Sequence, residues 1–168
     1  MAFDPSAPVL VVDGHDAEIQ IVRALLRQLG CADVDDAANV AEALAKMRSK
    51  RYGLVIANWD MTPATCCDFL FEARSDPRLN RIPFIMTGES KSSNVIAAKK
   101  AGANCYIVRP FNAQTLRVKI AAALATKVTP LPERQHAVAA AQSPQSADAD
   151  VPTAGRRKFD GVFTVSLK

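Results

Sequence analysis

The stretch Tyr52-Gly53-Leu54-Val55-Ile56-Ala57-Asn58-Trp59-Asp60-Met61 decides the fold of this chain. Residues 54–57 form a short apolar run centred on Val and Ile, which is typical of a strand buried on both faces of a parallel sheet. The run ends abruptly at Asn58. In an open α/β sheet, ligands and reacting groups collect at the carboxyl ends of the strands. Asn58 therefore stands where a functional site is expected.

Four further strand–helix units surround this stretch. Apolar runs at residues 9–12, 82–86 and 105–108 each precede a segment with apolar residues at helical spacing. A weaker run around Val34, set among acidic residues, predicts a short strand near the sheet edge. Five strand–helix repeats indicate a parallel sheet with helices on both faces. The predicted fold over residues 8–127 is therefore α/β, a doubly wound, flavodoxin-like sheet of five strands in a three-layer sandwich.

Single residues predict where helices begin and end. Asp16 and Asn39 are expected to cap the helices that follow them. Gly30 and Gly102 are expected to end theirs, because glycine readily adopts the left-handed backbone found at a helix C-terminus. The last helix is expected to run from about residue 112 to residue 126.

Polar residues follow the predicted strands at the points where the strands end. Parallel strands that share a direction end at one edge of the sheet, so these residues should converge there. They are Asp13, Gly14, Asn58, Thr87 and Arg109.

Composition limits the class of protein. The chain has 168 residues, of which 49% are hydrophobic and 23% charged, as in an ordinary soluble globular protein. No apolar run reaches the roughly 18–20 residues of a membrane span, and the first residues do not resemble a secretory signal, so we expect a cytoplasmic protein. The net charge of +4 is scattered, which favours a solvated surface and predicts no DNA-binding domain. The four cysteines lack zinc-site spacing.

The composition changes after the last predicted helix. Residues 1–7 are expected to form a flexible N-terminus. Residues 128–155 are rich in Ala, Gln, Ser, Asp and Pro without a helix or strand period, which predicts a flexible linker. Residues 156–168 begin with a basic triplet and then combine aromatic and β-branched residues, which predicts a short docking tail. A loose tail is the alternative.

Five short motifs together resemble one family. They lie at residues 10–13, 55–61, 86–88, 101–103 and 106–111. In this order, and at these strand ends, they resemble the receiver domain of two-component response regulators, and most of all the single-domain chemotaxis regulators of bacteria. The resemblance covers residues 8 to about 126 and leaves out the linker and tail.

The resemblance implies a specific chemistry. A typical receiver places two acidic residues after its first strand, an acceptor Asp after the third, a Thr or Ser after the fourth and a Lys after the fifth. The carboxylates hold Mg²⁺, a cation that prefers oxygen ligands. The metal neutralises the phosphoryl oxygens while the acceptor attacks phosphorus.

This sequence departs from that pattern at three of the five positions. The acceptor position is Asn58, the second acidic position is Gly14, and the Lys position is Arg109, while Asp13 and Thr87 match the family. An amide is not an anionic nucleophile, so we expect a chain that is not phosphorylated and not an enzyme. We expect no resident cofactor, with Mg²⁺ binding weak or lost and Asp13 the remaining candidate ligand. Arg109 is expected to hydrogen-bond Asp13 or Asn58 and to fill the phosphoryl space.

Two acidic residues offer alternatives to this interpretation. Asp60 lies two residues beyond Asn58 and is the candidate acceptor of a conventional phosphorylated regulator. Asp16 is the candidate replacement for the missing metal ligand, although helix capping is the favoured role.

The resemblance also implies an output surface. In the family this surface is formed by the fourth helix, fifth strand and fifth helix. Thr87 and Tyr106 match the hydroxyl residue and the aromatic residue that, in the family, move inward on phosphorylation. The predicted surface is basic, which suits an acidic amphipathic partner helix. By resemblance, that partner is a histidine kinase or a flagellar switch component. The residues are Tyr106, Lys91, Lys99, Lys100, Arg117 and Lys119.

The tail supports a second hypothesis of another class. Arg156, Arg157 and Asp160 form a short Arg-containing pattern, and Arg can bind phosphates and guanine edges bidentately. Some receiver-like proteins with such an extension bind cyclic di-GMP and then engage the flagellar motor. The sequence leaves three functions open: a non-phosphorylated signalling adaptor, which we favour, a cyclic di-GMP effector, and a conventional phosphorylated regulator.

Overall fold

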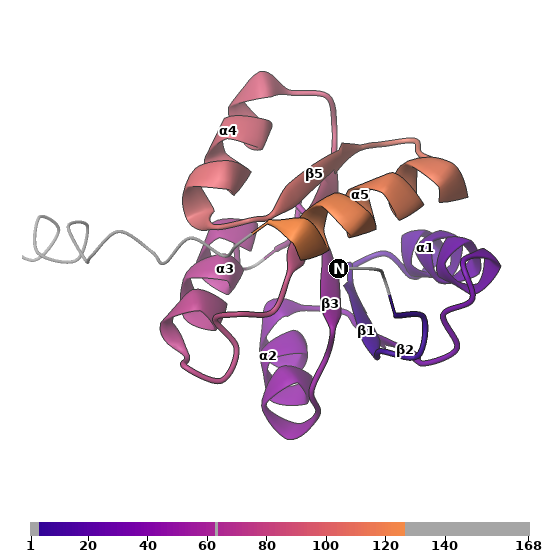
Figure 1. The fold of residues 1–168 in the computed structure, drawn as a ribbon. Helices are drawn as coiled ribbons and strands as arrows, with labels where there is room; N and C mark the ends of the chain where they lie inside the picture. The colour runs from indigo at the N-terminus through magenta and orange to yellow at the C-terminus, as the bar shows by residue number, and fades with distance from the viewer. Residues whose placement is uncertain (1–3, 63, 127–168) are drawn as a thin grey trace, which may run out of the picture. The chain divides into compact units, whose positions relative to one another are not determined.

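The structure is a computed structural model that describes residues 4–62 and 64–126. In this part of the chain, five strands alternate with five helices (Figure 1). The strands are β1 (Val9–Val12), β2 (Val34–Ala37), β3 (Leu54–Asn58), β4 (Phe84–Gly88) and β5 (Cys105–Val108). The helices are α1 (Asp16–Gln28), α2 (Val40–Ser49), α3 (Cys66–Ser75), α4 (Ser92–Ala101) and α5 (Ala113–Ala125).

The strands form one parallel sheet in the order β2-β1-β3-β4-β5. This order confirms the predicted doubly wound, flavodoxin-like fold. The short acidic strand β2 lies at an edge, as its sequence predicted. β3 is central, and all five of its residues are buried. The register places Asn58 beside Thr87, so two of the predicted site residues are neighbours across the β3–β4 pair.

Two apolar clusters lie on the two faces of the sheet. One packs α1 and α5 against the sheet, and the other packs α2, α3 and α4 against the opposite face (Figure 1). Alternate residues of the central strands serve the two clusters: Val55 and Ala57 belong to one, and Leu54 and Ile56 to the other. Burial of both faces explains why β3 reads as a continuous apolar run.

The expected helix ends are largely confirmed. Asn39 caps α2 by accepting the Glu42 N–H at 2.9 Å. Gly30 and Gly102 follow α1 and α4 with φ angles of 90° and 102°, a conformation that glycine adopts without steric cost. The expected cap at Asp16 is wrong. His15 holds the cap position without a side-chain bond, and Asp16 is the first residue inside the helix.

The fourth strand begins later than predicted. It was expected from residue 82, but β4 begins at Phe84. Proline has no N–H to donate to the ladder, so Pro83 contributes only its carbonyl, which accepts the Val55 N–H at 3.0 Å. The predicted linker at 128–155 and the tail at 156–168 lie outside the described residues. None of the helices that the structure describes is long and apolar enough to cross a membrane.

Candidate functional site

The ends of the strands bring four of the predicted residues into contact. Asp13 follows β1, Asn58 ends β3, Thr87 lies in β4, and Arg109 follows β5. The first three are only 3%, 4% and 1% exposed. We call this group of four side chains the strand-end pocket. Its members lie far apart in sequence and meet because parallel strands end at one edge of the sheet.

Arg109 occupies the centre of the strand-end pocket. Its Nη2 donates to Asp13 Oδ2 at 2.8 Å and to Thr87 Oγ1 at 2.9 Å. Its Nη1 lies 3.5 Å from Glu18 Oε2 at the start of α1. The expected bond from Arg109 to Asp13 is therefore present, and its second partner is Thr87. The planar guanidinium fork makes this bridging possible, because its donors have fixed directions.

Asp13 accepts hydrogen bonds at both carboxylate oxygens. Oδ2 receives Arg109, while Oδ1 accepts from Asn58 Nδ2 at 3.2 Å and from the His15 backbone N–H at 3.0 Å. The His15 ring also lies 3.2 Å from Oδ1. Sequence reasoning missed His15 and Glu18. The signal for His15 was its position two residues after an Asp, where a side chain commonly accepts a nearby backbone N–H.

The donor set does not fit a magnesium ion. A hard cation needs several oxygen ligands, and Asp13 supplies the one carboxylate of the pocket, already shared with a guanidinium and an amide. Gly14 adds no ligand, although nothing blocks one: a Cβ built there would find its nearest neighbour, Ala38 O, at 3.8 Å. The described residues contain no group of three acidic, His or Cys side chains arranged for a metal.

The two alternative acidic residues, Asp60 and Asp16, are not part of the strand-end pocket. Asp60 is exposed, and its backbone N–H donates to Asn58 Oδ1 at 3.1 Å. Asp16 is exposed in the first turn of α1. Neither carboxylate joins the hydrogen bonds that the structure describes around Asp13 and Arg109.

Tyr106 lies in β5 opposite Met86 of β4, and its neighbours were missed by sequence reasoning. Its hydroxyl donates to Glu89 O at 3.0 Å, and its ring meets Trp59 edge-on with the ring centroids 6.4 Å apart. A Cβ built on Gly88 would lie only 2.4 Å from the Tyr106 hydroxyl oxygen and 3.0 Å from Trp59 Cβ. Gly88 therefore leaves the space that Tyr106 occupies. Burial raises the pKa of Tyr106, which keeps its hydroxyl a neutral donor.

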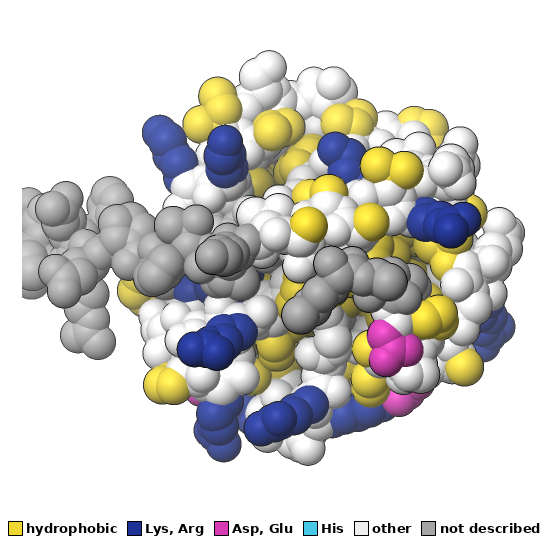
Figure 2. Space-filling model, viewed as in Figure 1, with side chains coloured by type: hydrophobic (Ala, Val, Ile, Leu, Met, Phe, Trp, Pro, Cys, Tyr) yellow, Lys and Arg dark blue, Asp and Glu magenta, His cyan; other side chains and the backbone are white. Residues whose placement is uncertain are grey.

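Tyr106 also lines a shallow groove between α4 and α5 over β5, which we call the α4–α5 groove. The groove has a volume of about 370 Å³, and Lys99 and Lys119 belong to its lining. Figure 2 shows Lys and Arg side chains over α4 and α5 with hydrophobic side chains among them. Of the other predicted residues of this surface, Lys91 pairs with Glu89 at 2.6 Å, while Lys100 and Arg117 are exposed on the same helices without lining the groove.

Comparison with known proteins identifies the family. The sequence profile described as the response regulator receiver domain matches residues 9–121. This chain belongs to that family. It is 36% identical over 113 residues to the chemotaxis protein CheY of Pseudomonas aeruginosa, covering 67% of this chain and 91% of that protein. It is 35% identical to chemotaxis protein CheY-3 of Vibrio cholerae, covering 67% and 87%.

Solved receiver structures share the fold. The chemotaxis response regulator CheY4 of Vibrio cholerae superposes with a TM-score of 0.65 at 31% identity, covering 71% of this chain and 99% of CheY4. A putative response regulator of Chloroflexus aurantiacus gives a TM-score of 0.68 at 27% identity, covering 72% and 99%. The resemblance found in the motifs is confirmed. The chain is a receiver of the chemotaxis type and acts in two-component signalling.

Three candidate residues lie outside the described part of the chain. Arg156, Arg157 and Asp160 follow residue 126, where the description ends. The cyclic di-GMP hypothesis rests on them and stays a prediction.

Proposed function

We propose that this receiver signals without being phosphorylated, as an adaptor that binds a protein partner through the α4–α5 groove. One observation carries the proposal. The Arg109 guanidinium bridges Asp13 Oδ2 and Thr87 Oγ1 at 2.8 and 2.9 Å, so a side chain of the receiver itself joins the residues that a phosphoryl group and its metal would join.

The chemistry of the pocket supports this assignment. Phosphorylation of a receiver needs an anionic oxygen as nucleophile, and Asn58 offers a neutral amide whose nitrogen donates to Asp13. Charge neutralisation by a metal needs further carboxylates, and position 14 is a glycine. The positive charge at the centre of the pocket comes from Arg109, which is held by two partners.

The groove supplies the binding function. Its lining includes apolar residues of α4 and two lysines, Lys99 and Lys119. An amphipathic helix with acidic residues on its polar face would complement both features. The relatives named above are chemotaxis proteins, so we assign the partner to motility signalling in the cytoplasm, as a histidine kinase or a flagellar switch component.

Intact-mass measurement after incubation with acetyl phosphate and Mg²⁺ tests the lost chemistry. We expect no added phosphoryl mass on the full-length chain. The triple variant Gly14→Asp/Asn58→Asp/Arg109→Lys restores the family pattern at positions with room for it and should gain a Mg²⁺-dependent adduct. A phosphoryl adduct on the unmodified chain that disappears with Asp60→Asn would refute the proposal and establish Asp60 as the acceptor.

Titration with a synthetic amphipathic helical peptide, carrying Glu on one face and Leu on the other, tests the groove. NMR shifts should concentrate on Tyr106 and the residues around Lys99 and Lys119. The charge-reversed pair Lys99→Glu/Lys119→Glu should weaken binding about tenfold or more, because like charges then face the peptide. The matched control Arg27→Glu/Arg78→Glu reverses two exposed charges elsewhere and should leave binding nearly unchanged. Equal weakening in both variants would point to net charge and not to the groove.

A further inference from the structure

Among the described residues, β2 is an outer strand of the sheet, and it carries two carbonyl groups that point away from β1. Val9 N and Asp13 N donate to the carbonyls of Asp33 and Ala37, so these face β1. The alternation of a strand then directs the carbonyls of Val34 and Asp36 outward. Unpaired groups of this kind on an edge strand are a template for pairing with another strand.

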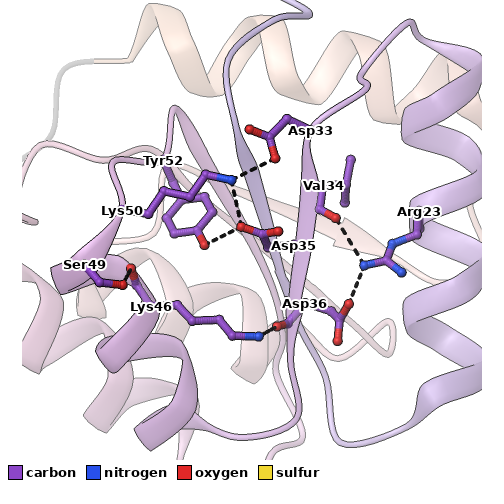
Figure 3. Close-up of polar contacts among 9 residues, drawn as sticks. All are labelled: Arg23, Asp33, Val34, Asp35, Asp36, Lys46, Ser49, Lys50 and Tyr52. Carbon is purple, nitrogen blue, oxygen red and sulfur yellow. Dashed lines mark hydrogen bonds and ion pairs between the residues drawn. The ribbon is translucent and has the colours of Figure 1, made fainter.

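Each outward carbonyl accepts a hydrogen bond from a cationic side chain (Figure 3). Arg23 of α1 donates from Nη2 to Val34 O at 3.1 Å, and Lys46 of α2 donates from Nζ to Asp36 O. The two helices pack on opposite faces of the sheet. The edge is therefore covered from both sides.

Each cation is also anchored by a carboxylate. Arg23 pairs with the Asp36 side chain, and Lys46 pairs with Glu42 at 2.9 Å. Glu42 in turn accepts the Ala38 N–H at 3.0 Å, and this hydrogen bond, followed by Lys46, holds the pKa of Glu42 below its usual value. The anchors fix both cations over the strand edge.

The rest of the acidic edge is partly compensated, with one lysine for two carboxylates. Lys50 Nζ lies 2.8 Å from Asp33 Oδ1 and 2.9 Å from Asp35 Oδ2, and the Tyr52 hydroxyl donates to Asp35 at 2.7 Å (Figure 3). Like charges directly opposite one another would destabilise a strand pair. Lys50 offsets one of these two negative charges, so charge repulsion between two such edges is reduced, and the coverage of the outward carbonyls becomes the larger barrier to pairing.

We propose that Arg23 and Lys46 prevent the β2 edge from pairing with the β2 edge of a second copy of this chain. The second copy is the occupant because it carries the same outward groups, and two identical edges can pair antiparallel about a two-fold axis. With both cations displaced, the edge is a pairing surface that joins the sheets of two copies.

The test compares two variants of the full-length chain. Arg23→Met/Lys46→Met/Asp36→Asn/Glu42→Gln removes two cations with their two carboxylates, so the net charge is unchanged. The matched control Asp36→Asn/Glu42→Gln keeps both cations. By light scattering, the fourfold variant should show twice the mass of the control. Hydrogen exchange at the amides of positions 34 and 36 should slow about tenfold or more when these groups become paired.

A proline substitution assigns any association to the β2 edge. The second variant is the fourfold variant with Asp36→Pro in place of Asp36→Asn. The N–H of position 36 points away from β1, so proline removes a hydrogen-bond donor of the pairing between two copies and leaves the β1–β2 ladder intact. This variant should return to the mass of one chain. Association that persists with proline, or equal mass and equal exchange in the fourfold variant and its control, would overturn the proposal. Circular dichroism verifies that each variant is folded, and Arg23→Ala/Lys46→Ala/Asp36→Asn/Glu42→Gln, which displaces both cations with the best helix-forming residue, replaces the fourfold variant if that one does not fold. An unchanged mass in that folded variant would also count against the proposal.

Discussion

The strand-end pocket and the α4–α5 groove are neighbours that share the β4–β5 region, yet they use their polar groups in opposite ways. In the pocket, buried Asp13, Asn58 and Thr87 are bonded to one another or to Arg109. In the groove, Lys99 is exposed, and Lys119 and Tyr106 are partly so, around an open volume of about 370 Å³. Most polar groups of the pocket are paired within it, although Arg109 Nε is buried without a partner among the described residues, whereas the polar groups of the groove are partly or fully exposed. The comparison teaches that, on one receiver fold, the polar side chains at the strand ends bond mainly to one another, whereas those of the groove reach solvent.

The largest expected effect concerns Arg74, whose side chain bonds Gly102 and Asn104 in the lining of the α4–α5 groove. Arg74 is 6% exposed and donates to the carbonyls of Asn80, Ile82 and Gly102 and to Asn104 Oδ1. Burial lowers its pKa to about 10. We expect Arg74→Met to cost about 3 kcal/mol or more of unfolding free energy in urea, since it leaves three partly buried carbonyls and the Asn104 side-chain oxygen without this donor.

Arg78 provides the matched control for that measurement. Its side chain is 74% exposed and pairs with Asp76 at 3.6 Å. Arg78→Met should change stability by less than about 0.5 kcal/mol, as exposed ion pairs contribute little. Similar losses in both variants would mean that Arg74 does not anchor the loop that lines the groove.

The next effect tests whether the pocket is held together by Arg109. The substitution Arg109→Met leaves the Asp13 carboxylate, whose side chain is 4% exposed, without its paired cation. We expect a cost of about 2 kcal/mol, because removal of one partner strands a buried charge. Urea unfolding measures it, and Glu18→Gln, which removes only the 3.5 Å contact at the rim, should cost much less. Equal costs would show that the pocket does not depend on the Asp13–Arg109 bond.

A smaller effect tests the link between the two regions. Gly88→Ala places a methyl group 2.4 Å from the Tyr106 hydroxyl oxygen and 3.0 Å from Trp59 Cβ, so Tyr106 must shift relative to Trp59. The cost should be about 1 kcal/mol, since a flexible side chain can yield. The fluorescence of Trp59, the single tryptophan of the chain, should report the movement. Gly14→Ala adds a methyl in open space and should leave the spectrum unchanged; an unshifted spectrum in Gly88→Ala would show that Gly88 does not position Tyr106.

The smallest effect concerns pH. Burial raises the pKa of Tyr106 above that of an unfolded tyrosine. Tyr106 therefore contributes a stabilisation that is fully present below the unfolded pKa of about 10 and is lost as the pH rises through the folded value. Urea unfolding at rising alkaline pH should show a larger loss in the unmodified chain than in Tyr106→Phe, because Tyr52 and the four cysteines, whose pKa values burial also raises, are present in both. The same pH dependence in both proteins would assign the loss to other groups.

The sequence by itself determined the fold class and which functional groups stand at the strand ends. A doubly wound sheet follows from local signals: the continuous apolar run at residues 54–57, the glycines after α1 and α4, and the order of the strand–helix units. Asn58 and Gly14 reveal the missing carboxylates without any coordinates, since a functional group is a property of the residue. The cap at Asp16 and the start of β4 were mispredicted, because the ends of elements depend on single hydrogen bonds.

The tertiary structure alone decided which partners the side chains have. Arg109 lies 96 residues from Asp13 in sequence, and its second bond goes to Thr87. The dependence of Tyr106 on Gly88 and the covering of the β2 edge by Arg23 and Lys46 also follow from contacts between elements. Sequence patterns report which face of an element is apolar, whereas the direction of a long polar side chain is set by the acceptors that folding brings within reach.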